Sequence, residues 1–254
     1  MLGSMTVKWL ALLGIPSLIG RWPGLLCLRI IIALGMSLVV GQSAAFGEFR
    51  VRAEDLPKPL LQQVRALGLT GPGAPEIPAF NWRLELKRPL RKARIIQEHF
   101  FGSQPGPNTG LSPTFRFDYP KQPETTSDAL SVRGLVRVSP DDTSISARVE
   151  GLSFPLEPKA SFKIFLKEPG IDVIQTCVVT GKAPASQLHA SLNGDATLIA
   201  CSGQGRYKGF DVKLHSTLHF IEVLGVFFNA LDEIDSPIGK LKAATRILDL
   251  KIGS

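Results

Sequence analysis

The sequence predicts a mainly β protein, an antiparallel β-sandwich or partly open barrel with a short N-terminal helix and a C-terminal helix. Three observations indicate this fold class. Apolar and polar residues alternate in many short runs, turn-forming residues separate the runs, and no helical patterns lie between them. A parallel α/β fold would need such helices. With 254 residues, 44% of them apolar, the chain can bury a full core in one domain, or at most two.

The first 45 residues differ in composition from the rest of the chain. They contain three basic residues and no acidic one, and an apolar run from Ile30 to Val40 precedes the small residues Ser43-Ala44-Ala45. This pattern predicts a secretory signal peptide, residues 1–45, cleaved after Ala45. A retained N-terminal membrane anchor is the alternative interpretation, because Gly24 to Val40 is nearly long enough to span a bilayer.

Residues 46–78 are predicted to form a helical arm followed by a linker. Asp55 can cap a short amphipathic helix that stops at Gly68, and Thr70 to Pro78 contains too much Gly and Pro for regular structure. The apolar face of this helix consists of Leu60, Leu61, Val64 and Leu67. A β-rich domain, residues 79–254, is expected to follow.

The first half of that domain reads mostly as strands. The alternating runs are Phe80–Leu86, 115–117, 130–139, 144–154, 162–166 and 171–180. Residues 90–101 fit the period of a helix and that of a strand. Pro89 and Gly102 at the ends of this segment favour the helix.

The spacing of two cysteines predicts the strongest long-range contact in the chain. Cys177 and Cys201 lie symmetrically about His189, so a chain that folds back there sets them opposite each other on antiparallel strands. In an exported chain this pair favours a disulfide, since Cys27 would leave with the signal peptide. The bond is worth about 3.5 kcal/mol in the chain-entropy estimate. Asn193-Gly194, in the same stretch, is the strongest local hairpin signal.

The last fifty residues are predicted as extended chain followed by a helix. Val212, Leu214, Leu218 and Phe220 alternate as in a strand, and Val223 to Leu231 is apolar on both sides, as in a buried strand or helix start. Ser236-Pro237 is a helix-start signal. The apolar side of this C-terminal helix would consist of Ile238, Leu241 and Leu248.

Catalytic, metal and cofactor motifs are not found. The chain contains no G-x-S-x-G, no HExxH and no paired CxxC. His215 and His219 could share a metal ion on a helix, but on a strand they lie about 13 Å apart, too far for one ion. We therefore predict no catalytic residue, no metal site and no cofactor.

One glycine-rich segment, Ser202 to Phe210, is the predicted place for ligand contact. Its glycines allow close backbone approach, and Arg206, Tyr207 and Lys208 offer a bidentate donor, an aromatic surface and a positive charge. The competing interpretation is a β-bulge or sharp bend with solvated side chains.

The net charge of the exported part argues against one class of partner, nucleic acids. Of the 29 basic residues 26 remain after the signal peptide, against 22 acidic ones, and no arginine-rich stripe with interleaved aromatics is present, so nucleic-acid binding is not expected. Six bases and one acid between Arg83 and Arg94 could meet an anionic polymer or a lipid surface, or form a solvated face.

The sequence thus favours an exported protein, periplasmic or extracellular, with a non-enzymatic binding or structural role in the envelope. Its ligand is unknown, with an anionic envelope component as the candidate partner. A membrane is a partner only if the N-terminal segment is retained. The alternatives are an exported hydrolase of envelope polymers, with catalytic groups scattered along the chain, and a carrier of an apolar ligand inside an open barrel.

Overall fold

The computed structural model describes residues 51–70, 74–119 and 127–253. All of them belong to one compact unit, Gly47–Ser254. The predicted signal peptide or anchor, residues 1–45, lies outside the described residues. Within the described ranges, no helix combines the length and the apolar character needed to cross a membrane.

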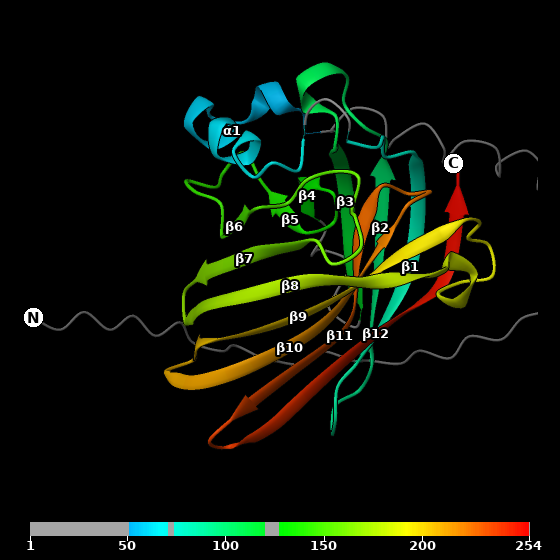
Figure 1. The fold of residues 1–254 in the computed structure, drawn as a ribbon. Coiled ribbons are helices and arrows are strands. Elements are labelled where there is room, and N and C mark those ends of the chain that lie inside the picture. Colours follow the sequence, from blue (N-terminus) through cyan, green and yellow to red (C-terminus); the bar gives the residue numbers. More distant parts are fainter. Residues whose placement is uncertain (1–50, 71–73, 120–126, 254) are drawn as a thin grey trace, which may run out of the picture. The chain divides into compact units, whose positions relative to one another are not determined.

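One α-helix and twelve strands make up the described part of the chain (Figure 1). The helix is α1, Lys58–Arg65. The strands are β1 Ala79–Lys87, β2 Arg94–Phe101, β3 Leu111–Tyr119, β4 Ser127–Val132, β5 Val136–Val138, β6 Ala147–Glu150, β7 Ser161–Glu168, β8 Ile171–Pro184, β9 Asp195–Tyr207, β10 Phe210–Ile221, β11 Val226–Ser236 and β12 Gly239–Ile252.

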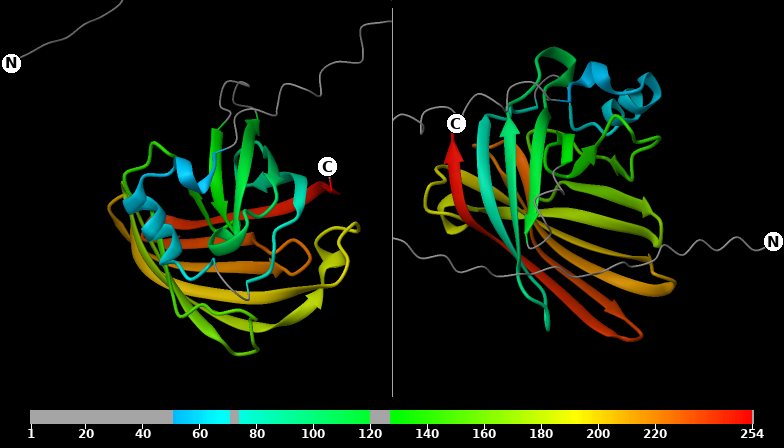
Figure 2. Two further views of the ribbon diagram at one scale, coloured as in Figure 1. Left: turned by 90° about the horizontal axis from the view of Figure 1, so that it is seen from above. Right: turned by 180° about the vertical axis from the view of Figure 1, so that it is seen from behind.

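The strands form one antiparallel, nearly closed, barrel-like sheet. Their order is β5-β4-β3-β2-β1-β12-β11-β10-β9-β8-β7-β6, so almost every strand pairs with its neighbours in the chain. The exception is the pairing of β1 with β12, which joins the two ends of the described sequence. Seen from above, the long strands β7 to β10 curve around the side on which β3 and α1 lie (Figure 2). The mainly β class and the short N-terminal helix are confirmed.

The predicted C-terminal helix is wrong. Residues 239–252 form the strand β12, which pairs with β11 over its first half and with β1 over its second half. Apolar residues at helical spacing suggested the helix, but hydrogen bonding to β11 and to β1 overrides that local preference. The prediction for 90–101 fails for the same reason: Arg94–Phe101 is the strand β2, held between β1 and β3.

The helix α1 forms, but with a different start from the predicted one. The carboxylate of Asp55 accepts the backbone N–H of Arg52 at 2.6 Å, which closes a preceding 3-10 turn, and α1 itself begins after Pro57. Leu60 and Val64 of α1 are fully buried.

Two apolar cores lie on opposite sides of the β10–β11 hairpin. Phe227 points into the first core, whereas its neighbour Phe228 points into the second, as alternate residues of a strand do. The first core joins α1 to strands β3–β11 and includes Leu60, Val64, Leu130, Val138, Phe162, Cys177, Ile199 and Phe220. The second joins β1, β2 and β12 to the hairpin tip and includes Phe80, Trp82, Phe100, Leu192, Ile221 and Leu250.

The predicted disulfide is present. Cys177 on β8 and Cys201 on β9 are direct cross-strand partners, with an S–S distance of 2.02 Å, and both are buried in the first core. The chain folds back between Pro184 and Asp195, around the predicted position of His189. Asn193-Gly194 does not form a two-residue hairpin; Gly194 instead ends the connection, and its carbonyl accepts the N–H of Ala185 at 2.9 Å.

The glycines after Cys201 have two different structural roles. A Cβ on Gly203 would overlap the carbonyl oxygen of Ile174 and lie 2.7 Å from Cα of Gln175, so this glycine permits β8 and β9 to approach closely. Lys208 and Gly209, both with positive φ, form the two-residue turn that joins β9 to β10. The sharp bend predicted within Ser202 to Phe210 is therefore present at the end of that segment, at Lys208-Gly209.

A buried arginine fastens three loops together. Arg133, in the β4–β5 turn, is 0% exposed. Its guanidinium donates to the carbonyl oxygens of Leu69 at 2.6 Å, Pro75 at 2.7 Å and Gly225 at 2.8 Å. Burial lowers the pKa of Arg133 to about 10, so the side chain stays protonated at neutral pH. We call this arrangement the Arg133 site.

Candidate functional site

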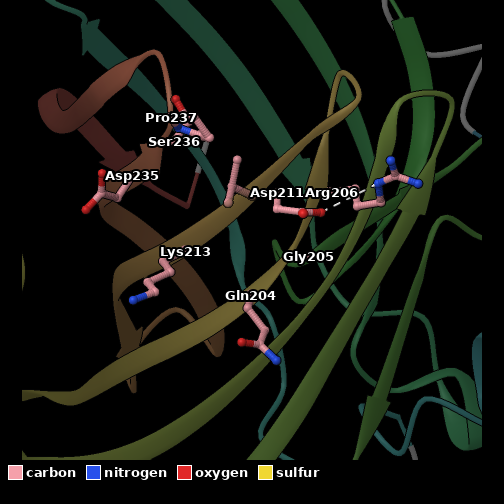
Figure 3. A pocket seen from close by; sticks show the side chains of 9 residues that line it. Gln204, Gly205, Arg206, Asp211, Lys213, Asp235, Ser236 and Pro237 are labelled. Atoms are coloured by element: carbon pink, nitrogen blue, oxygen red, sulfur yellow. Dashed lines mark ion pairs between the residues drawn. The ribbon is translucent and has the colours of Figure 1, made fainter.

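An open groove of about 570 Å³ lies between the ends of the β9–β10 and β11–β12 hairpins (Figure 3). Strands β9, β10 and β11 and the turn after β11 supply its walls. The lining residues are Gln204, Gly205, Arg206, Asp211, Val212, Lys213, Asp235, Ser236 and Pro237.

Strand register brings these residues together. The tight turn at Lys208-Gly209 sets Asp211 opposite Arg206, and two residues later Lys213 opposite Gln204. Lys213 also pairs with Asp235 of β11 on its other side. Because alternate residues of a strand share a face, the polar side chains of three strands line one surface.

Charged groups in the groove are exposed and only partly paired. Arg206 and Asp211 form an ion pair with an N···O distance of 3.7 Å, and their side chains are 71% and 92% exposed. Asp235 pairs with Lys240 at 3.6 Å. Such exposed pairs contribute little to stability and exchange partners readily. Among the described residues, Lys213 has no acidic partner within ion-pair distance.

The groove can therefore bind a polar ligand through both donors and acceptors. Arg206 offers a planar pair of N–H donors for a carboxylate, sulfate or phosphate, and Lys213 offers a positive charge. Gln204 and the carboxylates of Asp211 and Asp235 can accept hydrogen bonds from hydroxyl groups.

The three predicted contact residues separate in the structure. Arg206 lines the groove, but Tyr207 and Lys208 do not. Lys208 lies in the turn, with Nζ 5.5 Å from the centroid of the Tyr207 ring. Sequence reasoning misses Lys213 and Asp235, because no local pattern indicates the β10–β11 register that brings them to Arg206. Ser236-Pro237 forms a turn beside the groove and does not start a helix.

The histidine pair lies on a strand, as the spacing argument assumed. His215 is exposed, whereas His219 is half-buried, with its ring centroid 6.4 Å from that of Phe228. Nδ1 of His219 is buried without a hydrogen-bond partner, and burial lowers the pKa of this imidazole. In the described ranges, no three His, Cys, Asp or Glu side chains come together as a metal site would require.

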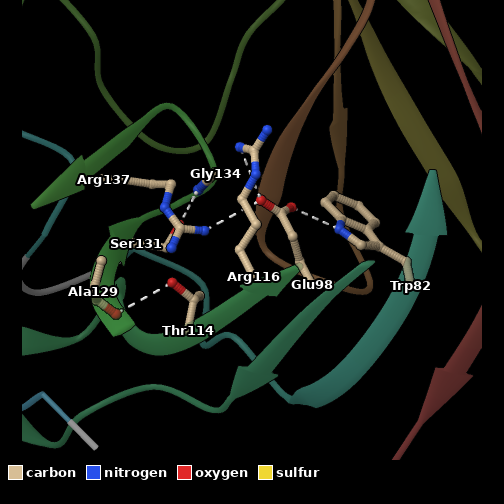
Figure 4. A network of polar contacts seen from close by, with 8 residues as sticks. All are labelled: Trp82, Glu98, Thr114, Arg116, Ala129, Ser131, Gly134 and Arg137. Carbon is tan, nitrogen blue, oxygen red and sulfur yellow. Dashed lines mark hydrogen bonds and ion pairs between the residues drawn. The ribbon is translucent and has the colours of Figure 1, made fainter. Parts of the chain in front are cut away.

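A buried carboxylate on the other half of the sheet contacts side chains of three further strands, β1, β3 and β5 (Figure 4). Glu98 of β2 accepts a hydrogen bond from Nε1 of Trp82 at 2.8 Å. Its other oxygen lies 3.4 Å from Arg116 and 3.3 Å from Arg137. The predicted helix over 90–101 hid this arrangement, because only a strand places Glu98 between Trp82 and Arg116. Its partners give Glu98 a structural role.

A second polar chain crosses four strands. Gln175 of β8 reaches over Gly203 and donates to Oγ of Ser216 at 2.9 Å. Ser216 donates in turn to Asp232 at 2.7 Å, and Asn229 donates to the other oxygen of that carboxylate at 2.7 Å. A serine that donates directly to a carboxylate, without an intervening base, is not arranged as an activated nucleophile. These hydrogen bonds therefore serve to hold the strands together.

Comparison with known proteins finds no match. No family model, curated protein or solved structure matches this chain.

Proposed function

We propose that this is an exported protein of the cell envelope, with a non-enzymatic binding role, and that its groove holds an anionic, hydroxyl-rich ligand. The observation that carries the proposal is the pair of cations, Arg206 and Lys213, on the walls of one open groove. Arg206 has only an exposed, long ion pair, so an anionic group can replace Asp211 as its partner at little cost.

The buried disulfide supports the export part of this proposal. Bonds of this kind form and persist in oxidising compartments and are rare in the cytosol. Cys177 and Cys201 are direct partners in the core, so the fold places them for oxidation.

The binding role is tested by calorimetric titration with a sulfated heparin tetrasaccharide, which offers both sulfate and hydroxyl groups. A neutral dextran tetrasaccharide is the matched ligand control. We expect Arg206→Ala/Lys213→Ala to weaken binding of the sulfated ligand at least tenfold, since charge-assisted hydrogen bonds are lost.

The control variant Lys163→Ala/Lys251→Ala removes two exposed cations away from the groove and should bind as wild type does. Equal loss in both double variants, or no binding by the wild type, would overturn the assignment of the groove.

Export is tested on protein recovered from cells that express the full chain. Mass measurement with and without reductant, after unfolding, should show a chain that begins at Phe46 and contains one disulfide. A chain that begins at Met1 and in which Cys177 and Cys201 are both free thiols would contradict export.

A further inference from the structure

The β1–β2 turn, residues 88–93, presents an apolar side chain at its surface. Leu90 is 106% exposed, which means that nothing in the described protein covers it. Its φ is +57°, a left-handed backbone conformation that residues other than glycine rarely adopt. Packing therefore does not explain a leucine at this position, and a strained, exposed residue of this kind points to a function.

Three cations surround this leucine. Arg88, Arg91 and Lys92 are all exposed, and none of them forms an ion pair with an acidic side chain of the described residues. The neighbouring Lys87, in contrast, pairs with Glu85 at 3.4 Å. The turn thus combines unpaired positive charge with an uncovered apolar group.

A neighbouring turn also exposes apolar side chains, while its lysine, Lys240, already pairs with Asp235 at 3.6 Å. Lys87 at the end of β1 pairs with Ala244, and β12 extends five residues beyond this pair, to Gly239 at the β11–β12 turn. The β11–β12 turn there carries Ile238, which is 76% exposed, and β12 continues with Lys240 and with Leu241, which is 53% exposed. Both turns lie at the same end of the sheet (Figures 1 and 2).

We propose that these two turns form a docking surface for an anionic lipid bilayer, which adjoins the groove but uses residues that do not line it, and which does not require the N-terminal segment. Leu90 and Ile238 enter the boundary between headgroups and acyl chains, while Arg88, Arg91 and Lys92 contact the negative headgroups. Interfacial binding of proteins uses this pairing of apolar area with basic residues. A soluble polyanion would need the cations but has no use for an exposed leucine between them.

Co-sedimentation with vesicles tests the proposal on protein purified as it matures in cells that express the full chain. Vesicles of phosphatidylcholine with phosphatidylglycerol are compared with vesicles of phosphatidylcholine alone. We expect preference for the anionic vesicles, a loss of about tenfold in Leu90→Gln, and a loss of about 100-fold in Arg88→Gln/Arg91→Gln/Lys92→Gln.

Two control variants keep these effects specific. Ile174→Gln removes an exposed apolar residue of β8, and Lys163→Gln/Lys251→Gln removes cations outside the turn; both should bind the vesicles as wild type does. Denaturant unfolding should give the same midpoint for Leu90→Gln and wild type, because Leu90 contributes no packing.

The outcomes distinguish a lipid-binding surface from a polymer-binding one. Unchanged vesicle binding in Leu90→Gln would overturn insertion, and equal binding to neutral vesicles would overturn lipid selectivity. If Arg88→Gln/Arg91→Gln/Lys92→Gln loses binding to long-chain heparin while no form binds vesicles, the surface recognises a polymer and the proposal is wrong. The groove variant Arg206→Ala/Lys213→Ala should keep its vesicle binding, so failure of one proposal leaves the other standing.

Discussion

Arginines at the two ends of the sheet have opposite environments. At one end, Arg133 is 0% exposed and its guanidinium donates to three backbone carbonyls. At the other end, where the β1–β2, β9–β10 and β11–β12 turns lie, Arg88 and Arg91 are exposed and have no acidic partner among the described residues. The fold depends on the first cation and not on the others. Positive charge at the turns is therefore free to serve recognition.

The largest expected effect is at the Arg133 site. Arg133→Met keeps most of the side-chain volume but leaves three carbonyl oxygens, two of them buried, without their donor. We expect a loss of about 4 kcal/mol in the free energy of unfolding, measured by urea denaturation with circular dichroism. Arg148→Met, at an exposed ion pair, should change it by less than about 0.5 kcal/mol. A loss below about 1 kcal/mol in Arg133→Met would mean that the fold does not depend on this cation.

A smaller effect is expected in the strands that carry the groove. Gly203→Ala would place a methyl group against the backbone of Ile174 and Gln175, and we expect about 2 kcal/mol of destabilisation. Gly181→Ala is the matched control in the paired strand, because its Cβ would meet nothing within 4 Å. Equal unfolding midpoints for the two variants would show that β8 and β9 can separate freely at Gly203.

The smallest effect concerns pH and the buried imidazole near the hairpin tip. Burial holds the pKa of His219 below its ordinary value of 6.5 in the folded state. The imidazole in the unfolded chain therefore binds a proton more readily than the one in the folded protein. Protonation thus favours unfolding, so the free energy of unfolding is unaffected by protonation of His219 above pH 6.5 and falls as the pH drops below it.

Urea midpoints between about pH 7.5 and about pH 5 test this prediction. His219→Phe should lose less stability on acidification than wild type does, whereas His215→Gln, four residues away on the same strand and exposed, should behave as wild type. The pKa of His99 is also lowered by burial, but its contribution to the pH dependence is the same in wild type and both variants, so it cancels in the comparison. The same slope in His219→Phe and wild type would contradict the assignment.

Local patterns predict those strands in which apolar and polar residues alternate without a competing helical period. Alternation identifies most strands, and the spacing of Cys177, His189 and Cys201 correctly indicates the β8–β9 pairing. For β2 and β12 the helical prediction is wrong, because their apolar residues also fit a helical period. What decides their conformation is pairing, and the partner of β12 in β1 lies more than a hundred residues away.

The candidate site could be predicted only in part for the same reason. Arg206 stands in a glycine-rich segment that local chemistry identifies. Lys213 and Asp235 reach the groove only through the β10–β11 register and the turn that follows β11. Arg133 gives no local signal at all, since an Arg-Gly turn ordinarily lies in solvent and only three distant loops bury it.

The lengths of the edge strands limit how the molecule can associate with copies of itself. Of the strands in the described ranges, the two at the edges are the shortest, with three residues in β5 and four in β6. The long strands, up to 14 residues in β8 and β12, have partners on both sides. An incoming chain that adds as a further strand thus finds only a few free backbone groups, so this sheet is a poor template for fibril growth.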